Sequence, residues 1–344
     1  MQNRIFSIIL PSFAISLMVC ADSQTIQVPE GKLTSHTTAF GDITPSAGPR
    51  VIEGCGVYLT GDYLYWTARE DNLSFAISGL QVTPSSSTGK GHKYSPRFKY
   101  TSGFKGGIGF DFGHDKWDMY MNYTWLNPHH NHKTVHSSND SILINNIIAL
   151  TSIESLQSAR ASWSLNFNVI DWELGRNFYI SKFLSLRPFF GLKGTWQKQS
   201  LDVDYDVIGS SNIESANTND FWGVGPMGGV DTTWHLPGTW SLFADVGLSS
   251  LWGAFTVKRK DTLSDPKETI YHVEDVIHTV KPVLEMQLGI RKEEWFCADR
   301  YHFALQVGWE QQVWFDQNQF DFCLQDRQGN LTMQGVTAKA RFDF

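Results

Sequence analysis

The sequence predicts an all-β protein, a transmembrane antiparallel β-barrel of about 10–12 strands. Three observations lead to this fold class. Apolar and polar residues alternate along many successive segments, which is the pattern of strands with one apolar face. Tight turns alternate with long polar connections along the chain, as they do between the two ends of a membrane barrel. Tryptophans stand at both ends of several predicted strands, as in the aromatic girdles of such barrels.

Residues 1–21 have the features of a signal peptide. A positively charged Arg4 precedes a mostly apolar run, residues 5–19, and Ala21 is a small residue at the expected cleavage site. The run is too short to cross a bilayer as a helix. The alternative is a lipoprotein signal that ends at Cys20, which the bulky residues before that cysteine disfavour. The sequence therefore predicts export.

Residues 22–55 are rich in Thr, Ser, Pro and Gly and have no sustained period, so we expect a flexible periplasmic segment ahead of a barrel over residues 56–344. After cleavage, 27 basic against 35 acidic residues leave a net charge of −8, which argues against a nucleic-acid partner. A mean hydropathy of −0.25 excludes a bundle of membrane helices, whereas 14% aromatic and 18% charged residues suit a barrel with one lipid-facing side.

Alternation is clearest at the C-terminus, where Val336, Ala338, Ala340, Phe342 and Phe344 share one face. An even number of strands places both termini in the periplasm, and a further hairpin in the long connections would raise the count to twelve. The ten predicted strands are residues 56–69, 97–113, 116–127, 160–179, 184–200, 220–235, 239–258, 276–291, 301–315 and 331–344.

One strand changes phase between Val169 and Ile170, which predicts a β-bulge. Tryptophans twelve residues apart, 222 to 234 and 240 to 252, span roughly 30 Å at ~3.3 Å per residue and a tilt of about 40°. Residues 292–300 form a longer turn on the periplasmic side. The long, polar extracellular loops are predicted at residues 70–96, 128–160, 200–219, 259–277 and 316–331.

Three stretches resemble a known family. They are Gly61-Asp62-Tyr63-Leu64-Tyr65-Trp66, Val169-Ile170-Asp171-Trp172-Glu173-Leu174-Gly175-Arg176-Asn177-Phe178 and Leu184-Ser185-Leu186-Arg187-Pro188-Phe189-Phe190-Gly191-Leu192. They are similar to the Legionella-type pore-forming major outer membrane proteins, which also occur in environmental chlamydiae. The resemblance covers the chain from about residue 56 to the end. It implies a bacterial outer-membrane barrel for small solutes, with no catalytic residues and no cofactor. The C-terminal Phe344 fits the terminal aromatic that barrel-insertion machinery recognises.

The polar faces of the strands carry charged residues that we expect to line the lumen, where rings of charge set ion preference. In a narrow barrel these charges would instead pair and fill the lumen, because eight strands leave room only for side chains. The predicted pore-lining residues are Arg97, Lys99, Lys105, Asp111, Asp118, Asp171, Glu173, Arg187, Lys193, Asp245, Lys281, Glu285, Arg291, Glu310, Lys339, Arg341 and Asp343.

The favoured function is passive diffusion of small solutes or ions through a porin. One alternative is a surface-exposed structural or adhesin barrel with a filled lumen. A second, weaker alternative is an omptin-type barrel protease, which needs acids and a histidine near the outer rim. Asp202, Asp204, Asp206, Asp275 and His278 lie near that level, but no characteristic motif accompanies them. We therefore expect no enzyme activity.

Three cysteines remain after cleavage of the signal peptide, so at least one thiol has no partner within the chain. Cys55 and Cys297 fall on the same side of the membrane and are the candidate disulfide pair, which the oxidising periplasm permits. Cys323 falls in the last extracellular loop, where a free or intermolecular thiol is expected.

Two features of the second long loop stand out. The segment Ser141–Leu156 is apolar, which suggests an inward fold, an extra hairpin, or contact between protomers of a homo-oligomer. His129, His130, His132 and His136 have a spacing that can bind Zn or Ni, but a mobile polar loop is the commoner explanation, so no metal site is predicted. The expected partners are outer-membrane lipid, the insertion machinery, and small solutes or ions.

Overall fold

The computed structural model describes most of the predicted barrel. The predicted signal peptide and nearly all of the predicted N-terminal segment lie outside the described residues. The described residues are 47–49, 51–52, 54–78, 91–112, 117–129, 131–137, 143–145, 147, 156–321 and 328–344.

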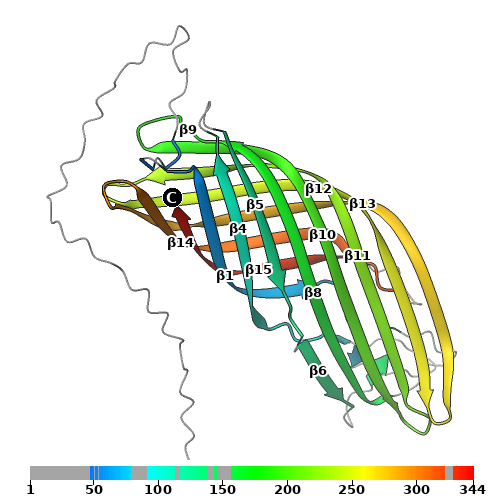
Figure 1. The fold of residues 1–344 in the computed structure, drawn as a ribbon. Coiled ribbons are helices and arrows are strands. Elements are labelled where there is room, and N and C mark those ends of the chain that lie inside the picture. The colour runs from blue at the N-terminus through cyan, green and yellow to red at the C-terminus, as the bar shows by residue number, and fades with distance from the viewer. Residues whose placement is uncertain are drawn as a thin grey trace, which may run out of the picture. The chain divides into compact units, whose positions relative to one another are not determined.

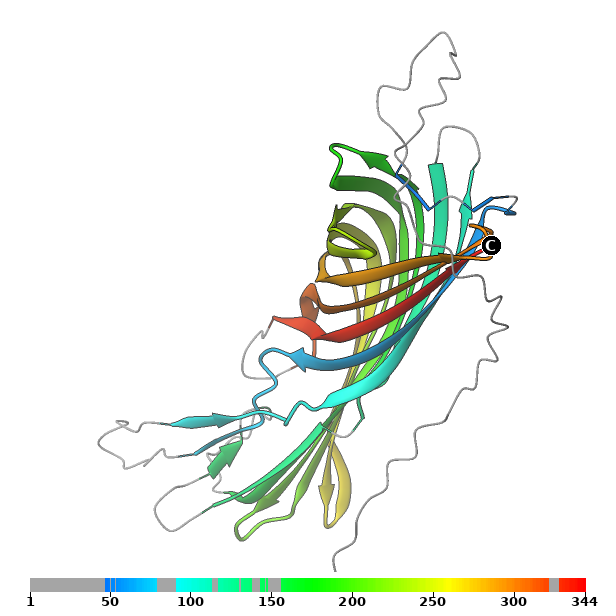
Figure 2. The ribbon, with the colours of Figure 1, turned by 90° about the vertical axis from the view of Figure 1, so that its left-hand side faces the viewer.

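Ten long antiparallel strands form a closed ring in this part of the chain (Figures 1 and 2). Each pairs with the next long strand along the chain, and β1 pairs with β15 to close the ring. The predicted all-β barrel of about 10–12 strands is confirmed. In ring order the strands are β1 (Val57–Glu70), β4 (Tyr100–Asp111), β5 (Trp117–Leu126), β8 (Leu156–Arg176), β10 (Leu184–Val207), β11 (Ile213–His235), β12 (Trp240–Ser264), β13 (Lys267–Phe296), β14 (Tyr301–Asn318) and β15 (Gly329–Asp343).

The two ends of the ring differ. We call the end with the tight connections 180–183, 236–239 and 297–300, where the C-terminus also lies, the turn end. The opposite end is the loop end. Short strands extend the sheet at the loop end and, for the last of them, at the turn end: β2 (Ala76–Ser78), β3 (His92–Tyr94), β6 (Asn131–His136), β7 (Leu143–Asn145) and β9 (Phe178–Tyr179).

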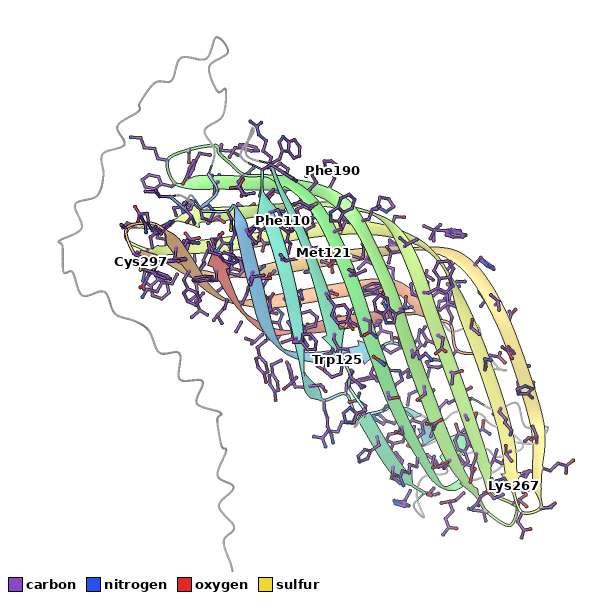
Figure 3. All side chains as sticks on the ribbon, viewed as in Figure 1. Phe110, Met121, Trp125, Phe190, Lys267 and Cys297 are labelled. Atoms are coloured by element: carbon purple, nitrogen blue, oxygen red, sulfur yellow. The ribbon has the colours of Figure 1, made fainter. Side chains whose placement is uncertain are left out.

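Two of the predicted long loops are strands instead. Residues 200–219 and 259–277 continue the β10–β11 and β12–β13 pairs, leaving only residues 208–212 and 265–266 as turns. These hairpins reach farthest at the loop end, where Lys267 is labelled in Figure 3. The predicted turn at 292–300 is also shorter, because β13 runs to Phe296.

The outer face of the ring carries a belt of exposed apolar side chains. Trp196, Trp222 and Trp252 mark its loop-end side, and Trp234 and Trp240 its turn-end side; all five are about half exposed. Figure 3 labels further residues on the outer face: Phe110, Met121, Trp125 and Phe190. The predicted girdles are therefore present at both edges. Among the described residues, no helix is long and apolar enough to span a membrane.

On the outer face, exposed ion pairs lie between the apolar belt and the loop end. Lys198 on β10 stands opposite Asp220 on β11, with a nitrogen–oxygen distance of 3.9 Å, and Lys258 on β12 binds Glu274 on β13 at 2.6 Å. Charged, exposed pairs of this kind belong in water or lipid headgroups rather than in hydrocarbon. The strands beyond them thus project past the apolar belt.

The predicted β-bulge in β8 is absent. Val169 pairs with Thr195 and Ile170 with Gly194, without any shift in register. The inward face of β8 instead changes character along its length: Trp163 and Phe167 are apolar, and Asp171 is charged. The change of phase in the sequence therefore reflects a change from apolar to charged surroundings inside the ring, and not an extra residue in the strand.

That change divides the lumen in two. The loop-end half is an apolar core of fully buried side chains, among them Trp66, Trp163, Phe167, Phe255 and Trp314. Residues from the connections between the long strands complete this core: Leu73, Phe75, Leu143, Ile147 and Phe320. The described residues of Ser141–Leu156 thus lie inside the ring, as in the inward fold that was one of the predicted options. The turn-end half is polar and holds the site described next.

Candidate functional site

A cavity of about 530 Å³ occupies the turn-end half of the lumen. The side chains around it come from every long strand of the ring, because each strand directs alternate residues inward. Eight carboxylates line it (Asp62, Asp171, Glu173, Asp231, Asp245, Glu285, Glu293 and Glu310), against five cations (Lys105, Arg187, Arg291, Lys339 and Arg341). Eight negative and five positive charges give the wall a net charge of −3 when the histidines are neutral.

Arg187 on β10 organises one side of the cavity. Its guanidinium donates to Asp118 at 2.9 Å, to Glu173 at 2.9 Å and to Asp231 at 2.8 Å. These carboxylates come from β5, β8 and β11, so a single side chain connects four strands. Charge-assisted bonds to a planar guanidinium are the strong kind, and they fix the position of the three acids.

Two lysines hold further carboxylates in place. Lys193 is fully buried and binds Asp171 at 2.6 Å and Glu285 at 3.0 Å. Lys105 on β4 pairs with Glu310 on β14 across the lumen. These pairs hold charge at the middle of the ring without leaving it unbalanced, as buried charge requires.

Some charged groups in the cavity wall have unused bonding capacity. Asp62 is 8% exposed and its Oδ1 has no hydrogen-bond partner; the same holds for Oδ1 of Asp245. Among the described side chains, no carboxylate pairs with Lys339, whose Nζ lies 5.1 Å from the centre of the Tyr120 ring. Since Asp62 stands directly opposite Lys339 on the neighbouring strand, the cavity presents both signs of charge to a solute.

The structure brings together most, but not all, of the predicted pore-lining residues. Ten of the seventeen border the cavity: Lys105, Asp171, Glu173, Arg187, Asp245, Glu285, Arg291, Glu310, Lys339 and Arg341. Asp118, Lys193 and Asp343 are held just behind this wall by ion pairs with Arg187, Glu285 and Arg341. Asp111 and Asp118 also border a much smaller neighbouring space.

Three predicted positions lie elsewhere. Lys281 is buried closer to the loop end, with its Nζ 2.6 Å from the carbonyl oxygen of Asp316. Arg97 and Lys99 precede β4 and are exposed, so their predicted lumen position is wrong. The reason is that Phe98 between them turns inward and packs edge-on against Trp163 at 5.4 Å, which reverses the expected alternation.

The wall also contains residues that sequence reasoning missed. Asp62, Asp231, Glu293 and His302 all border the cavity. Asp62 was hidden because its inward neighbours Leu64 and Trp66 are as apolar as the outward tyrosines of β1. His302 is on the polar face of the predicted strand 301–315, and that position could have indicated that it faces the lumen.

Described residues of the N-terminal segment cross the turn-end mouth of the cavity. Ala47, Gly48 and Pro49 border the cavity, and the amide of Ala47 donates to the carbonyl of Asn177, after β8, at 3.4 Å. Five residues later, the amide of Ile52 donates to the carbonyl of Asp299, between β13 and β14, at 2.9 Å. Because β8 and the β13–β14 pair stand on opposite sides of the ring, the described residues 47–49 and 51–52 partly cover the mouth.

Hydrogen bonds fix the segments that close the other end. Tyr205 donates to the carbonyl of Phe75 at 2.6 Å, and Asn219 donates to that of Gln317 at 3.0 Å. The fully buried Arg259 pairs with Asp261 at 2.6 Å and donates to the carbonyl of Asp321 at 3.0 Å. The apolar core is thus roofed by ordered loop backbone, which limits exchange between the cavity and the loop end.

The predicted disulfide is not formed. Cys55 and Cys297 are both free and exposed, and the thiol of Cys55 donates to the carbonyl of Phe344 at 3.0 Å. Sharing one side of the membrane did not bring the two sulfurs together, because Cys55 adjoins the C-terminus and Cys297 belongs to the β13–β14 turn. Cys323 lies outside the described residues.

Other candidate clusters do not assemble within the described ranges. No group of three or more His, Cys, Asp or Glu side chains that could hold a metal is found there, and His130 lies outside them. Of the acids considered for a protease, Asp202 and Asp204 are exposed on the outer face. Partial burial, followed by the charge of Glu214, raises the pKa of Asp204 above its ordinary value.

Several solved structures are similar in fold to this chain. The outer membrane protease OmpT from Escherichia coli has 10% identity and a TM-score of 0.39, covering 84% of this chain and 96% of that one. A Pseudomonas aeruginosa FadL homologue has 8% identity and a TM-score of 0.24, with 84% and 89% covered. The ΔS2S3 mutant of TodX, a monoaromatic hydrocarbon channel, has 9% identity and a TM-score of 0.27, with 84% and 90% covered.

At the level of sequence, no curated protein matches the chain. A family model described as the Legionella pneumophila major outer membrane protein precursor matches residues 56–344. That range begins one residue before β1 and ends at the C-terminus, so it contains the whole ring. The chain therefore belongs to the Legionella major outer membrane protein family, and its ring is a β-barrel of the bacterial outer membrane.

Proposed function

We propose that this protein is a pore-forming outer-membrane protein that passes small polar solutes or ions by passive diffusion. The observation that carries the proposal is the 530 Å³ charged cavity inside the barrel. A barrel whose only task is structural has no need of a hollow lined by thirteen ionisable groups of both signs, several of them with unused bonding capacity. In outer-membrane barrels the turn end is periplasmic, so this cavity is the periplasmic vestibule of the proposed path.

Conduction requires the apolar core at the loop end to open. Hydrophobic constrictions gate channels by excluding water. Two of the aromatic side chains in this core, Phe75 and Phe320, come from loops rather than from the ring. We therefore assign the gate to these loop segments, whose displacement would leave the strand pairing intact.

The decisive experiment is single-channel recording of the refolded mature chain in a planar bilayer. We expect rare stepwise openings from the native chain and a higher open fraction from the double variant Phe75→Ala/Phe320→Ala. Phe190→Ala is the matched control, because Phe190 is 57% exposed on the lipid-facing side. Equal open fractions in the three proteins would remove the gate from these loops.

The filled loop-end half of the lumen favours a second candidate, a surface-exposed structural barrel. Under this function, correctly folded native and double-variant proteins are both silent in the bilayer. We assign no catalytic role in either case, because the acids considered for a protease do not converge: Asp202 and Asp204 point outward, and Asp206 accepts a hydrogen bond from Ser158.

A further inference from the structure

His302 is a fully buried histidine with one nitrogen left unused. Its Nδ1 lies 2.7 Å from Oδ2 of Asp343, whose carboxylate is also bound by Arg341 at 2.6 Å. Oδ2 of Asp343 is thus the acceptor for an Nδ1–H of His302. In a neutral ring with this hydrogen bond the lone pair is on Nε2, and Nε2 has no hydrogen-bond partner.

Glu293 supplies a second ligand at the same place. Its Oε1 lies 4.0 Å from Nε2 of His302 and 3.6 Å from Nη1 of Arg291, and all three residues border the cavity near its turn-end mouth. The separation from His302 is too long for an N–H···O bond, which ends at about 3.2 Å. Two ligand atoms with ~2.1 Å bonds to a tetrahedral metal stand about 3.4 Å apart. A side-chain rotation that moves Oε1 of Glu293 roughly half an ångström toward Nε2 of His302 would bring the two atoms to this separation.

The surroundings suit a metal ligand. A carboxylate on the far nitrogen of a coordinating histidine fixes its tautomer and orientation, and Asp343 has that position. The Trp295 ring, centred 4.5 Å from that of His302, limits the movement of the imidazole. The described residues offer two protein ligands there and not three, so the remaining coordination positions would be taken by water from the adjoining cavity.

We propose that His302 and Glu293 form a binding site for a divalent transition-metal cation at the periplasmic mouth of the cavity. Imidazole and carboxylate together suit ions such as Zn²⁺, whereas Mg²⁺ and Ca²⁺ prefer oxygen ligands alone. A site with two protein ligands binds exchangeably. It therefore fits a cation that pauses at the mouth rather than one that holds the fold together.

Zn²⁺ titration of the detergent-folded mature chain, followed by isothermal calorimetry, tests the site. We expect a Zn²⁺-binding event that Glu293→Gln weakens at least tenfold and His302→Gln abolishes. Glu293→Gln keeps the His302–Asp343 bond, so it remains informative if His302→Gln fails to fold. The matched controls are Glu294→Gln, next to the site but exposed, and His272→Gln at the loop end.

The controls also separate this site from the loop histidines 129–136, which are unchanged in every variant. Identical isotherms for the native chain, Glu293→Gln and His302→Gln would overturn the proposal, as would an equal loss in Glu294→Gln. The result does not depend on conduction. A silent bilayer with intact Zn²⁺ binding contradicts only the pore, and a conducting barrel without Zn²⁺ binding at His302 contradicts only this site.

Discussion

Reversing the charge of Lys339 should make the proposed pore prefer cations more strongly. Lys339 is the best position for this change, because it borders the cavity and no described carboxylate pairs with it. Arg341, by contrast, is bound to Asp343 and lies over the Tyr58 ring at 3.7 Å, so its replacement would disturb packing as well as charge. Lys339→Glu changes the net charge of the wall from −3 to −5.

The size of the effect follows from Coulomb's law. A unit charge roughly 7 Å from an ion in water contributes about 0.6 kcal/mol. Screening, with a Debye length of about 10 Å at 0.1 M salt, roughly halves this value. Changing the charge from +1 to −1 doubles the screened energy, so a permeating cation is stabilised and a permeating anion destabilised by about 0.6 kcal/mol each. Together these are about 1.2 kcal/mol, close to tenfold in the permeability ratio.

The assay is the reversal potential of single channels in a KCl gradient. We expect that of Lys339→Glu to move toward the potassium equilibrium potential. Lys198→Glu is the matched control, since it makes the same change of charge on an exposed side chain of the outer face. Stepwise currents with an unchanged reversal potential in Lys339→Glu, or an equal shift in Lys198→Glu, would refute a path along this wall.

Four further outcomes are expected. Arg187→Met leaves three carboxylates without their cation and should cost about 3–5 kcal/mol of folding free energy, which would lower the urea midpoint of unfolding. Lys292→Met, the control in an exposed ion pair, should cost at most about 1 kcal/mol. Equal urea midpoints in the two variants would contradict the role of Arg187. Trp163→Ala removes a fully buried indole and should cost roughly 3–5 kcal/mol, whereas Trp196→Ala, which removes a lipid-facing indole and leaves the interior packed, should cost less in the same unfolding assay. Alkylation of the folded protein without reductant should label both Cys55 and Cys297 in the mass spectrum, and a linked peptide pair would contradict the free thiols. Deleting Phe344 should lower the yield of heat-modifiable barrel in the outer membrane while export continues, and a normal yield would rule out its role in assembly.

The ring itself was predictable because lipid imposes one rule on every strand. Wherever outward residues meet hydrocarbon, apolar side chains recur at every second position, as along Trp240, Leu242 and Val246. This pattern located all ten strands. It also explains why ten of the predicted charges border one cavity, since residues between apolar positions must point inward.

The hairpins beyond the membrane were not predictable from the same rule. Outside the belt, both faces meet water or polar neighbours, so alternation fades along residues 259–277. Residues 200–207 held a weaker signal: Leu201, Val203 and Tyr205 alternate with acids, but their apolar face is inward rather than outward. The predicted bulge in β8 was wrong for the same reason, because apolar residues that face a core inside the barrel give the same sequence pattern as residues that face lipid.

The cavity wall was partly hidden for a different reason. Asp62 and His302 gain their importance from residues on neighbouring strands, Lys339 and Asp343, and sequence spacing does not record the register between strands. The positions of Ala47 and Ile52 likewise depend on single backbone hydrogen bonds to Asn177 and Asp299. No periodic pattern accompanies contacts of this kind.

The long hairpins have a practical consequence for labelling the cell surface. From Lys258 to Ser264 the β12–β13 ladder continues for six residue steps, or roughly 15 Å of height at ~3.3 Å per residue and a tilt of about 40°. An antibody would therefore meet a rigid sheet, and its epitopes there would depend on folding. A peptide tag inserted within this ladder would break paired strands. At Gly209, in a turn with φ of +77° and open space around it, a tag should be displayed without disturbing the barrel.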